Sequence, residues 1–117
     1  MSNTIRQLEE GILLSSFRGK IDLDSVNEFV TNVEPYLDGA SSVLHFIVDA
    51  NNEERWSLSA RREFTKIFDS KSYGKVGILN AERVTRIVAT FLMVATRRKD
   101  SVRFFDNESD ALAWLKE

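Results

Sequence analysis

The pattern of apolar and polar residues predicts an antiparallel hairpin at the start of the chain. Two short runs, residues 4–8 and 12–17, flank a tight turn that ends at Gly11. Short runs around a glycine turn are typical of two strands that pair with each other. Apolar residues then recur at helical spacing from Leu23 to Leu37, in one stripe. A helix with this stripe turned toward the core is therefore expected after the hairpin.

The ends of this first helix carry recognisable signals. Asp22 or Asp24 can cap the amino end, because a short carboxylate accepts hydrogen bonds from free N–H groups of the first turn. Pro35 lies in the last part of the pattern, and Gly39 closes it. We expect the helix to kink or to end early there, since proline removes a backbone hydrogen bond.

The rest of the chain alternates between strand-like and helix-like segments. Residues 43–48 form a nearly continuous apolar run, as expected of a central strand covered on both faces. Asp49 is expected to end this strand, and a polar loop over 50–56 to lead to a second helix capped by Ser59. In the second helix we expect Arg62 and Lys66 to face outward and four residues to face inward: Ala60, Phe64, Ile67 and Phe68. A strand over 75–79, a third helix over about 81–97 and a strand over 102–105 follow. Asn107 is expected to cap a last helix, in which four residues face inward: Ala111, Leu112, Trp114 and Leu115.

The order of these elements is β-β-α-β-α-β-α-β-α. Strands that alternate with helices imply parallel crossover connections, and the opening hairpin adds an antiparallel pair. We therefore predict an α/β fold, a mixed five-stranded sheet with helices packed against it. The length fits one domain over residues 1–117, and the five glycines and single proline leave no linker-like segment.

Composition and charge exclude several classes of protein. The absence of cysteine excludes disulfides and thiolate metal sites, and it favours a cytoplasmic location. The amino end lacks a signal-peptide pattern, and the longest apolar stretch, residues 87–95, is too short for a membrane-spanning helix. Ten acidic and four basic residues lie in 1–60, against eight acidic and twelve basic in 61–117. The low pI of about 5.5 argues against nucleic-acid binding.

Two segments resemble the STAS domain, and within it the SpoIIAA-like (STAS/SEC14) group. The strand Val43-Leu44-His45-Phe46-Ile47-Val48-Asp49 is similar to the central strand of that domain, which ends in Asp. The run Val102-Arg103-Phe104-Phe105-Asp106, followed by Asp110-Ala111-Leu112-Ala113-Trp114-Leu115, is similar to its last strand and helix. The resemblance implies the fold predicted above and a regulatory role in bacteria through protein interaction.

The resemblance also implies a phosphorylatable serine at the start of the second helix, where Ser57 and Ser59 lie. The sequence Trp56-Ser57-Leu58-Ser59-Ala60 lacks the aspartate before and the glycine after the serine of the signalling members. Ser59 therefore has two interpretations, a helix cap and a phosphoacceptor. His45, the only histidine, lies in a predicted buried strand, where a packed and hydrogen-bonded ring is expected.

A polar segment follows the central strand and is a candidate contact surface. The residues of this candidate partner or ligand loop are Asp49, Asn51, Glu53, Glu54, Arg55 and Trp56. Ligands bind near the carboxyl ends of strands in open α/β sheets, so these side chains could line a polar pocket. The alternative is a solvated loop, because loops are polar by default.

The predicted third helix carries an unusually broad apolar surface. The residues that widen it are Phe91, Leu92, Met93 and Val94, and basic residues flank both ends. Three interpretations stay open: burial in the core, a homodimer surface, or contact with a lipid or another apolar ligand.

The favoured hypothesis is a non-enzymatic regulatory or protein-interaction module that docks an unknown protein partner through the edge of the second helix and the adjoining loop. The alternative is a small-molecule or lipid-binding domain, and a hydrolytic or isomerising enzyme that uses the carboxylates Asp49, Glu53 and Glu54 comes last. Gly74 and Gly77 do not form a phosphate-binding motif, so an enzyme that uses ATP or a dinucleotide is not expected. We expect no cofactor, no metal and no catalytic residue.

Overall fold

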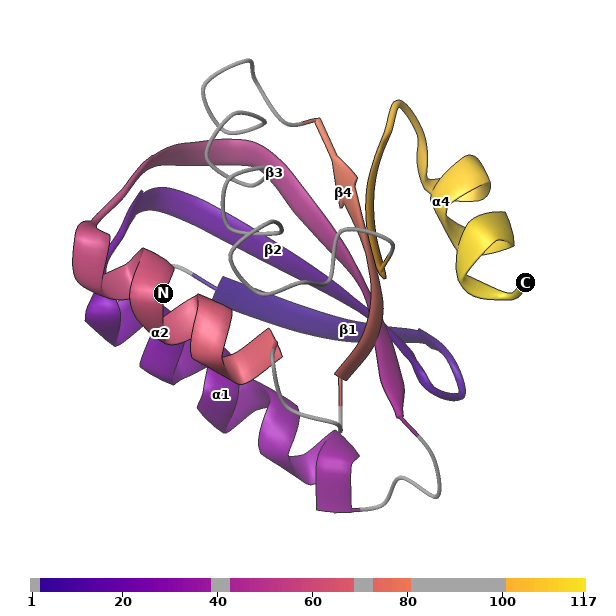
Figure 1. Cartoon of the computed structure of the whole chain (residues 1–117), viewed down its shortest axis with the longest axis horizontal. Coiled ribbons are helices and arrows are strands. Elements are labelled where there is room, and N and C mark those ends of the chain that lie inside the picture. The colour runs from indigo at the N-terminus through magenta and orange to yellow at the C-terminus, as the bar shows by residue number, and fades with distance from the viewer. Residues whose placement is uncertain (1–2, 39–42, 69–72, 81–100) are drawn as a thin grey trace.

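The computed structural model describes residues 3–38, 43–68, 73–80 and 101–117 (Figure 1). Five strands form one sheet in the spatial order β1-β2-β3-β4-β5. The pair β1/β2 is antiparallel, and the three other neighbouring pairs are parallel, which confirms the predicted mixed sheet. The strands are β1 Asn3–Glu9, β2 Ile12–Ile21, β3 Leu44–Trp56, β4 Tyr73–Leu79 and β5 Val102–Phe105.

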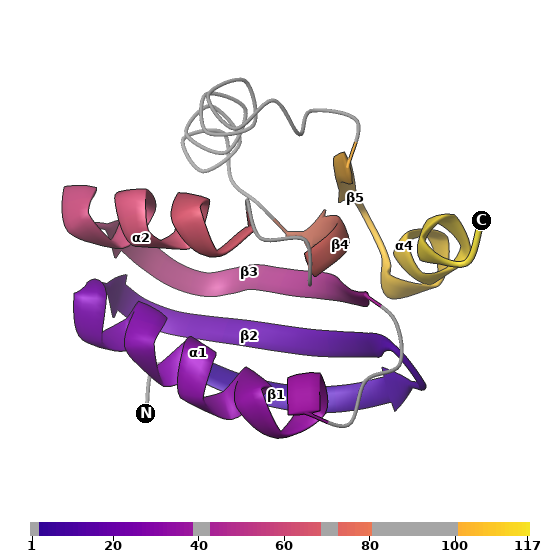
Figure 2. The same ribbon diagram turned by 60° about the horizontal axis from the view of Figure 1, so that its bottom comes forward.

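Helices cover the two faces of this sheet (Figure 2). Helices α1 (Leu23–Asp38) and α2 (Leu58–Phe68) pack on one face, and α4 (Glu108–Leu115) packs on the other. The alternation of side chains along β2 explains this division, because Leu13 and Phe17 join the core under α1 and α2 while Ile12 joins the core under α4. The predicted third helix, over about 81–97, lies outside the described residues.

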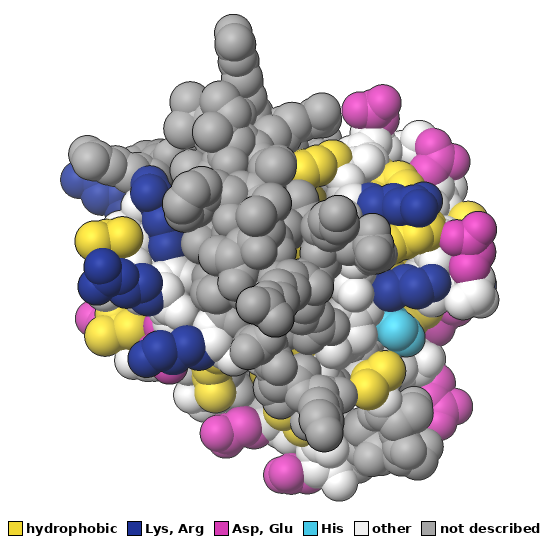
Figure 3. Space-filling view, in the orientation of Figure 1, with side chains coloured by type: hydrophobic (Ala, Val, Ile, Leu, Met, Phe, Trp, Pro, Cys, Tyr) yellow, Lys and Arg dark blue, Asp and Glu magenta, His cyan; other side chains and the backbone are white. Residues whose placement is uncertain are grey.

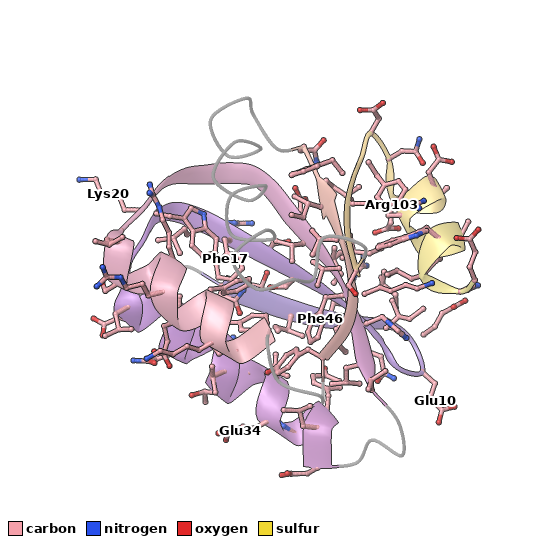
Figure 4. All side chains as sticks on the ribbon, in the orientation of Figure 1. Glu10, Phe17, Lys20, Glu34, Phe46 and Arg103 are labelled. Atoms are coloured by element: carbon pink, nitrogen blue, oxygen red, sulfur yellow. The ribbon has the colours of Figure 1, made fainter. Side chains whose placement is uncertain are left out.

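Aromatic rings fill the larger of the two cores. Phe17, Phe29 and Phe46 are fully buried, and the centroid of the Phe29 ring lies 5.8 Å from the centroids of both other rings. Figure 4 labels Phe17 and Phe46 between the sheet and the two helices. The smaller core lies under α4 and contains Ile12, Ile47, Leu79, Ala111, Trp114 and Leu115.

A buried polar network attaches the edge strand β1 to helix α1. The Asn3 side-chain amide donates to Ser15 Oγ at 2.8 Å, and its carbonyl oxygen accepts from Asn32 Nδ2 at 3.1 Å. The Asn3 backbone N–H donates to Glu28 Oε1 at 2.9 Å. Asn3 and Ser15 are fully buried, so these bonds supply partners that the two side chains would otherwise lack.

The ends of α1 resolve the two alternatives left open by the sequence. Asp22 is the cap, because its Oδ1 accepts the Ser25 N–H at 3.0 Å. The helix does not end at Pro35 but continues to Asp38. Leu23 was expected to face inward, and that expectation is wrong: as the first residue of the helix it lies beyond the end of the sheet and is exposed.

The structure also corrects the predicted end of β3. The strand does not stop at Asp49 but continues to Trp56, so residues 50–56 form no loop. β2 also continues past its predicted end at Phe17, to Ile21. It pairs with this part of β3, for example Arg18 with Asn52. Pairing satisfies the backbone groups whatever the side chains are, and a polar composition is therefore no reason for the strand to end.

Helix α4 has the predicted cap and the predicted packing. Asn107 Oδ1 accepts the Asp110 N–H at 2.8 Å, which confirms Asn107 as the cap. Trp114 is buried, and the cationic groups of Lys75 and Arg103 lie 5.3 Å and 5.2 Å from its ring centroid. Within the described ranges, no helix has the length and apolar character needed to cross a membrane.

Candidate functional site at the amino ends of α1 and α2

Helices α1 and α2 begin side by side at the carboxyl edge of the sheet, where strands β2 and β3 end. Ile21 and Trp56, the last residues of the parallel strands β2 and β3, are paired, and the Ser57 N–H donates to the Ile21 carbonyl at 2.9 Å. α1 starts two residues after Ile21, and α2 starts two residues after Trp56. The carboxyl edge of parallel strands, where open α/β sheets bind their ligands, therefore carries both helix starts.

Ser57, and not Ser59, caps α2. The Ala60 N–H donates to Ser57 Oγ at 3.1 Å, and the Arg61 N–H donates to the Ser57 carbonyl at 3.1 Å. The prediction of Ser59 as the cap is wrong because β3 extends to Trp56, so that α2 begins directly after Ser57. Ser59 lies in the first turn with an exposed side chain, its Oγ 3.2 Å from Ser57 Oγ. Phosphorylation of either serine stays a prediction.

Asp22 caps α1 with a different set of bonds. Besides the Ser25 N–H, its Oδ1 accepts the Ser25 hydroxyl at 3.1 Å. The backbone N–H of Ser25 and then its hydroxyl lower the pKa of the Asp22 carboxyl below the ordinary value of 3.8, because both bonds favour the charged form. At neutral pH the start of α1 therefore carries its own negative charge.

Two exposed leucines stand at this edge, and we call them the leucine pair: Leu23 and Leu58. Leu58 is 59% exposed and Leu23 is 41% exposed, and each is the first residue of its helix. Among the residues that the structure describes, the other exposed large apolar side chain is Val43, which precedes β3 at the opposite edge. Two exposed leucines at neighbouring helix starts make this edge a candidate surface for contact.

Sequence reasoning missed Leu58, although a signal for it exists. The apolar stripe of α2 is formed by Ala60, Phe64 and Ile67, which face the core. Leu58 is two positions before Ala60, so it lies on a different side of the helix from that stripe. The signal is therefore an apolar residue outside the core stripe of an amphipathic helix, which is expected to be exposed. In this chain that residue is Leu58, between the two candidate serines.

The structure separates the residues of the predicted contact loop. Trp56 is half-buried, and its ring centroid lies 5.3 Å from Phe17 and 5.1 Å from Phe64, so it borders the aromatic core. Asp49 precedes Trp56 by seven residues along one strand, roughly 20 Å at about 3.3 Å per residue. The Asp49 carboxylate accepts a hydrogen bond from Asn80 Nδ2 at 3.1 Å instead. A partner contact through these residues stays a prediction.

His45 is packed and hydrogen-bonded, as predicted. Its Nδ1 accepts the backbone N–H of Lys75 at 2.9 Å. Burial, and then the charge of Lys75, lower the pKa of the His45 ring below its ordinary value of 6.5. The ring therefore acts as a neutral acceptor within the β3/β4 ladder, at the edge opposite the leucine pair.

The remaining predicted site residues lie where the structure gives no side-chain description. The side chains of Asn51, Glu53, Glu54 and Arg55 belong to this group although β3 passes through them, and the residues Phe91, Leu92, Met93 and Val94 lie outside the described ranges altogether. Within the described part of the chain, no three His, Asp or Glu side chains gather in a way that could hold a metal ion.

Comparison with known families gives one match that spans nearly the whole chain. The model of a domain of unknown function, DUF7793, matches residues 6–117. The chain belongs to this family. No curated protein matches the sequence.

Solved structures with the same fold cover the chain almost completely. An uncharacterised protein of the DUF3478 family with a SpoIIAA-like fold, from Shewanella loihica PV-4, matches with a TM-score of 0.72 and 20% identity, covering 97% of this chain and 91% of its own. The anti-sigma factor antagonist SpoIIAA in its unphosphorylated form matches with a TM-score of 0.63 and 14% identity, covering 97% of each chain. The phosphorylated form of SpoIIAA, described as a Bacillus cell fate determinant, has a TM-score of 0.59 and 14% identity, covering 97% of this chain and 98% of its own. These likenesses confirm the predicted SpoIIAA-like STAS fold.

Proposed function

We propose that this chain is a regulatory protein-interaction module that docks a partner protein at the amino end of α2. The observation that carries the proposal is Leu58, an apolar side chain that is 59% exposed and held between Ser57 and Ser59 at the start of a capped helix. The proposal assigns no catalytic step to the protein, and it places the module in the cytoplasm.

The energetics favour such a role for Leu58. Burial of its exposed surface in an interface would contribute about 1–2 kcal/mol, or roughly five- to thirty-fold in affinity. Ser57 anchors the first turn of α2 through the bonds to Ala60 and Ile21, so the backbone around Leu58 is already ordered. A partner that binds an ordered surface pays little conformational entropy, which leaves more of the apolar gain as affinity.

The comparisons support the proposal through SpoIIAA, described as an anti-sigma factor antagonist and solved with and without phosphate. In our proposal Ser59 is the preferred phosphoacceptor in this chain, because its side chain is exposed while that of Ser57 is half-buried and engaged as the cap. A phosphate on Ser59 would lie at a helix amino end, which favours negative charge. It would also place a dianion next to Leu58 and so change the docking surface.

Site-specific photo-crosslinking in the native host tests the docking site. A photoreactive amino acid replaces Leu58 in one variant and Val43 in the control, since both side chains are exposed and apolar but lie at opposite edges of the sheet. We expect a discrete protein adduct from position 58 that is absent from position 43. Identical adduct patterns from both positions, or no adduct from position 58, would refute the proposed docking site.

The small-molecule or lipid-binding alternative and the predicted homodimer both depend on Phe91, Leu92, Met93 and Val94. These residues lie outside the described part of the chain. Native mass spectrometry distinguishes the alternatives, because a bound ligand adds its mass to the chain and a dimer doubles it.

A further inference from the structure

We propose that the partner of this surface is a protein segment with an apolar anchor followed by acidic side chains. The inference rests on the proposed function and names the chemistry of the partner. Leu58 supplies the apolar contact, and a row of cations that begins beside it on α2 supplies the charge.

The cations lie in line with Leu58 on the outer face of α2. Arg62 and Lys66 follow Leu58 at intervals of four residues, and all three side chains are exposed. Residues four apart lie on the same helix face one turn from each other, so these three form a single row. At a rise of about 1.5 Å per residue, the two charges lie about 6 Å and about 12 Å along the helix from Leu58.

Lys20 is a further exposed cation near the start of α2, at the end of β2. It is exposed and directly precedes Ile21, whose carbonyl accepts the Ser57 N–H. Dark-blue Lys and Arg side chains gather in Figure 3 at the end of the molecule where α2 begins, with apolar side chains between them. Figure 4 labels Lys20 at the same end.

The start of α2 lacks the internal negative charge that the start of α1 has. The first turn of α2 contains no acidic residue, whereas α1 has Asp24 in its first turn and the Asp22 carboxylate as its cap. Arg62 and Lys66 are like charges one turn apart on the same helix face, and such a pair raises the free energy of the isolated protein. Carboxylates from a partner would relieve this repulsion and would also be favoured near the amino end of α2, so this surface is electrostatically complementary to an acidic segment.

The charges of α1 favour a protein over an anionic membrane. α1 contains four acidic residues and no basic residue, and it lies alongside α2 on the same face of the sheet (Figure 2). Among its exposed side chains are Asp24, Glu34 and Asp38. A flat anionic bilayer that reached the cations of α2 would bring its headgroups close to these carboxylates, which would repel them. A protein segment is narrow enough to follow the α2 row alone.

The test uses photo-crosslinking from position 58 of the full chain in native lysate, with two further variants. Arg62→Glu combined with Lys66→Glu reverses the row, and Arg62→Lys combined with Lys66→Arg keeps its charge. Circular dichroism and thermal unfolding establish that both variants fold like the parent. We expect the adduct yield to fall at least tenfold on charge reversal and to stay within twofold in the charge-conserving variant.

Two further readouts identify the chemistry of the partner. Raising NaCl from about 0.1 M to about 1 M shortens the Debye length from about 10 Å to about 3 Å, so the adduct yield should fall severalfold. Mass spectrometry of the cross-linked peptide should show an apolar residue at the attachment point with Asp or Glu within two helical turns of it.

The outcomes separate this inference from the proposed function. An adduct whose yield is unchanged by charge reversal and by salt overturns the acidic partner while the docking function stands. No adduct from position 58 overturns both. An adduct with a lipid, or with a second copy of this chain, overturns the assignment of a separate acidic protein.

Discussion

Replacement of Gly74 by alanine would bring a methyl group too close to the His45 ring. An ideal Cβ at position 74 lies 2.5 Å from His45 Nδ1 and 2.6 Å from His45 Cε1, and 3.2 Å from Val43 Cγ2. Distances below 3.0 Å do not occur between such atoms, so the ring or the strand has to move. The ring is not free to swing away, because its Nδ1 accepts the Lys75 N–H at 2.9 Å.

The expected loss of stability combines two effects. Overpacking of a filled site costs about 1–3 kcal/mol. Displacement of the ring would also leave the half-buried Lys75 N–H without its acceptor, at roughly 1 kcal/mol. We therefore expect Gly74→Ala to lower the free energy of unfolding by about 2–4 kcal/mol.

Gly77→Ala is the matched control, since it is the same substitution in the same strand. A Cβ at Gly77 lies 3.3 Å from both Ala111 Cβ and Phe105 Cδ2, a tight contact that shifts of a few tenths of an ångström relieve. Any effect of the substitution on the unfolded chain is shared by both variants. Gly77→Ala should consequently cost less than Gly74→Ala, by about 1 kcal/mol or more.

Urea denaturation followed by tryptophan fluorescence measures these differences, and His45→Ala supplies a double-mutant cycle. His45→Ala removes the obstructing ring, so Gly74→Ala should cost less than about 1 kcal/mol in that background. An equal cost of Gly74→Ala with and without His45 would refute the proposed clash. A larger cost for Gly77→Ala than for Gly74→Ala would refute the comparison of contact distances.

Three further predictions concern hydrogen bonds. Burial, and then the charge of Lys75, lower the pKa of His45, so the unfolded chain binds a proton more readily than the folded chain does. The contribution of the neutral His45 to the free energy of unfolding should therefore be complete above about pH 6.5 and be lost as the pH drops through the folded pKa. Urea midpoints between pH 8 and pH 5 should show this fall in the parent and less of it in His45→Gln, and parallel curves would contradict the reasoning. Ser57→Ala should cost about 1 kcal/mol of unfolding free energy and Ser59→Ala less than about 0.5 kcal/mol, and equal losses would argue against Ser57 as the cap. Asn107→Ala should cost about 1 kcal/mol while Asn107→Asp retains the cap, and equal denaturation midpoints for both would contradict the assigned role.

Periodicity along the chain predicted much of the fold because the signals involved are local. The hairpin needs only Gly11 between two short strands, and β1 and β2 pair as expected. The cap of α4 depends on a side chain and an N–H three residues apart, so Asn107 is recognisable from the sequence. The packed state of His45 followed from its place between apolar neighbours in a strand.

The candidate site was predicted only in part. The sequence located the serines at the start of the second helix, but it assigned the cap to Ser59 and placed a loop before it. Both errors have one cause, the extension of β3 to Trp56, which depends on pairing with β2 more than thirty residues earlier in the chain. The composition of residues 50–56 alone favours a loop, because Asn and Glu are depleted in strands, so the strand is revealed only by its pairing with β2.

The sequence by itself determined the alternation of elements and most of the core stripe of each described helix, Leu23 excepted, since these follow from periods of two and 3.6 residues. Only the tertiary structure decided that α1 and α2 start at the same edge. The paired ends of β2 and β3 bring Leu23 and Leu58 to neighbouring helix starts, although thirty-five positions separate them in the chain. The surface formed by the two leucines therefore exists only once the parallel strands have paired.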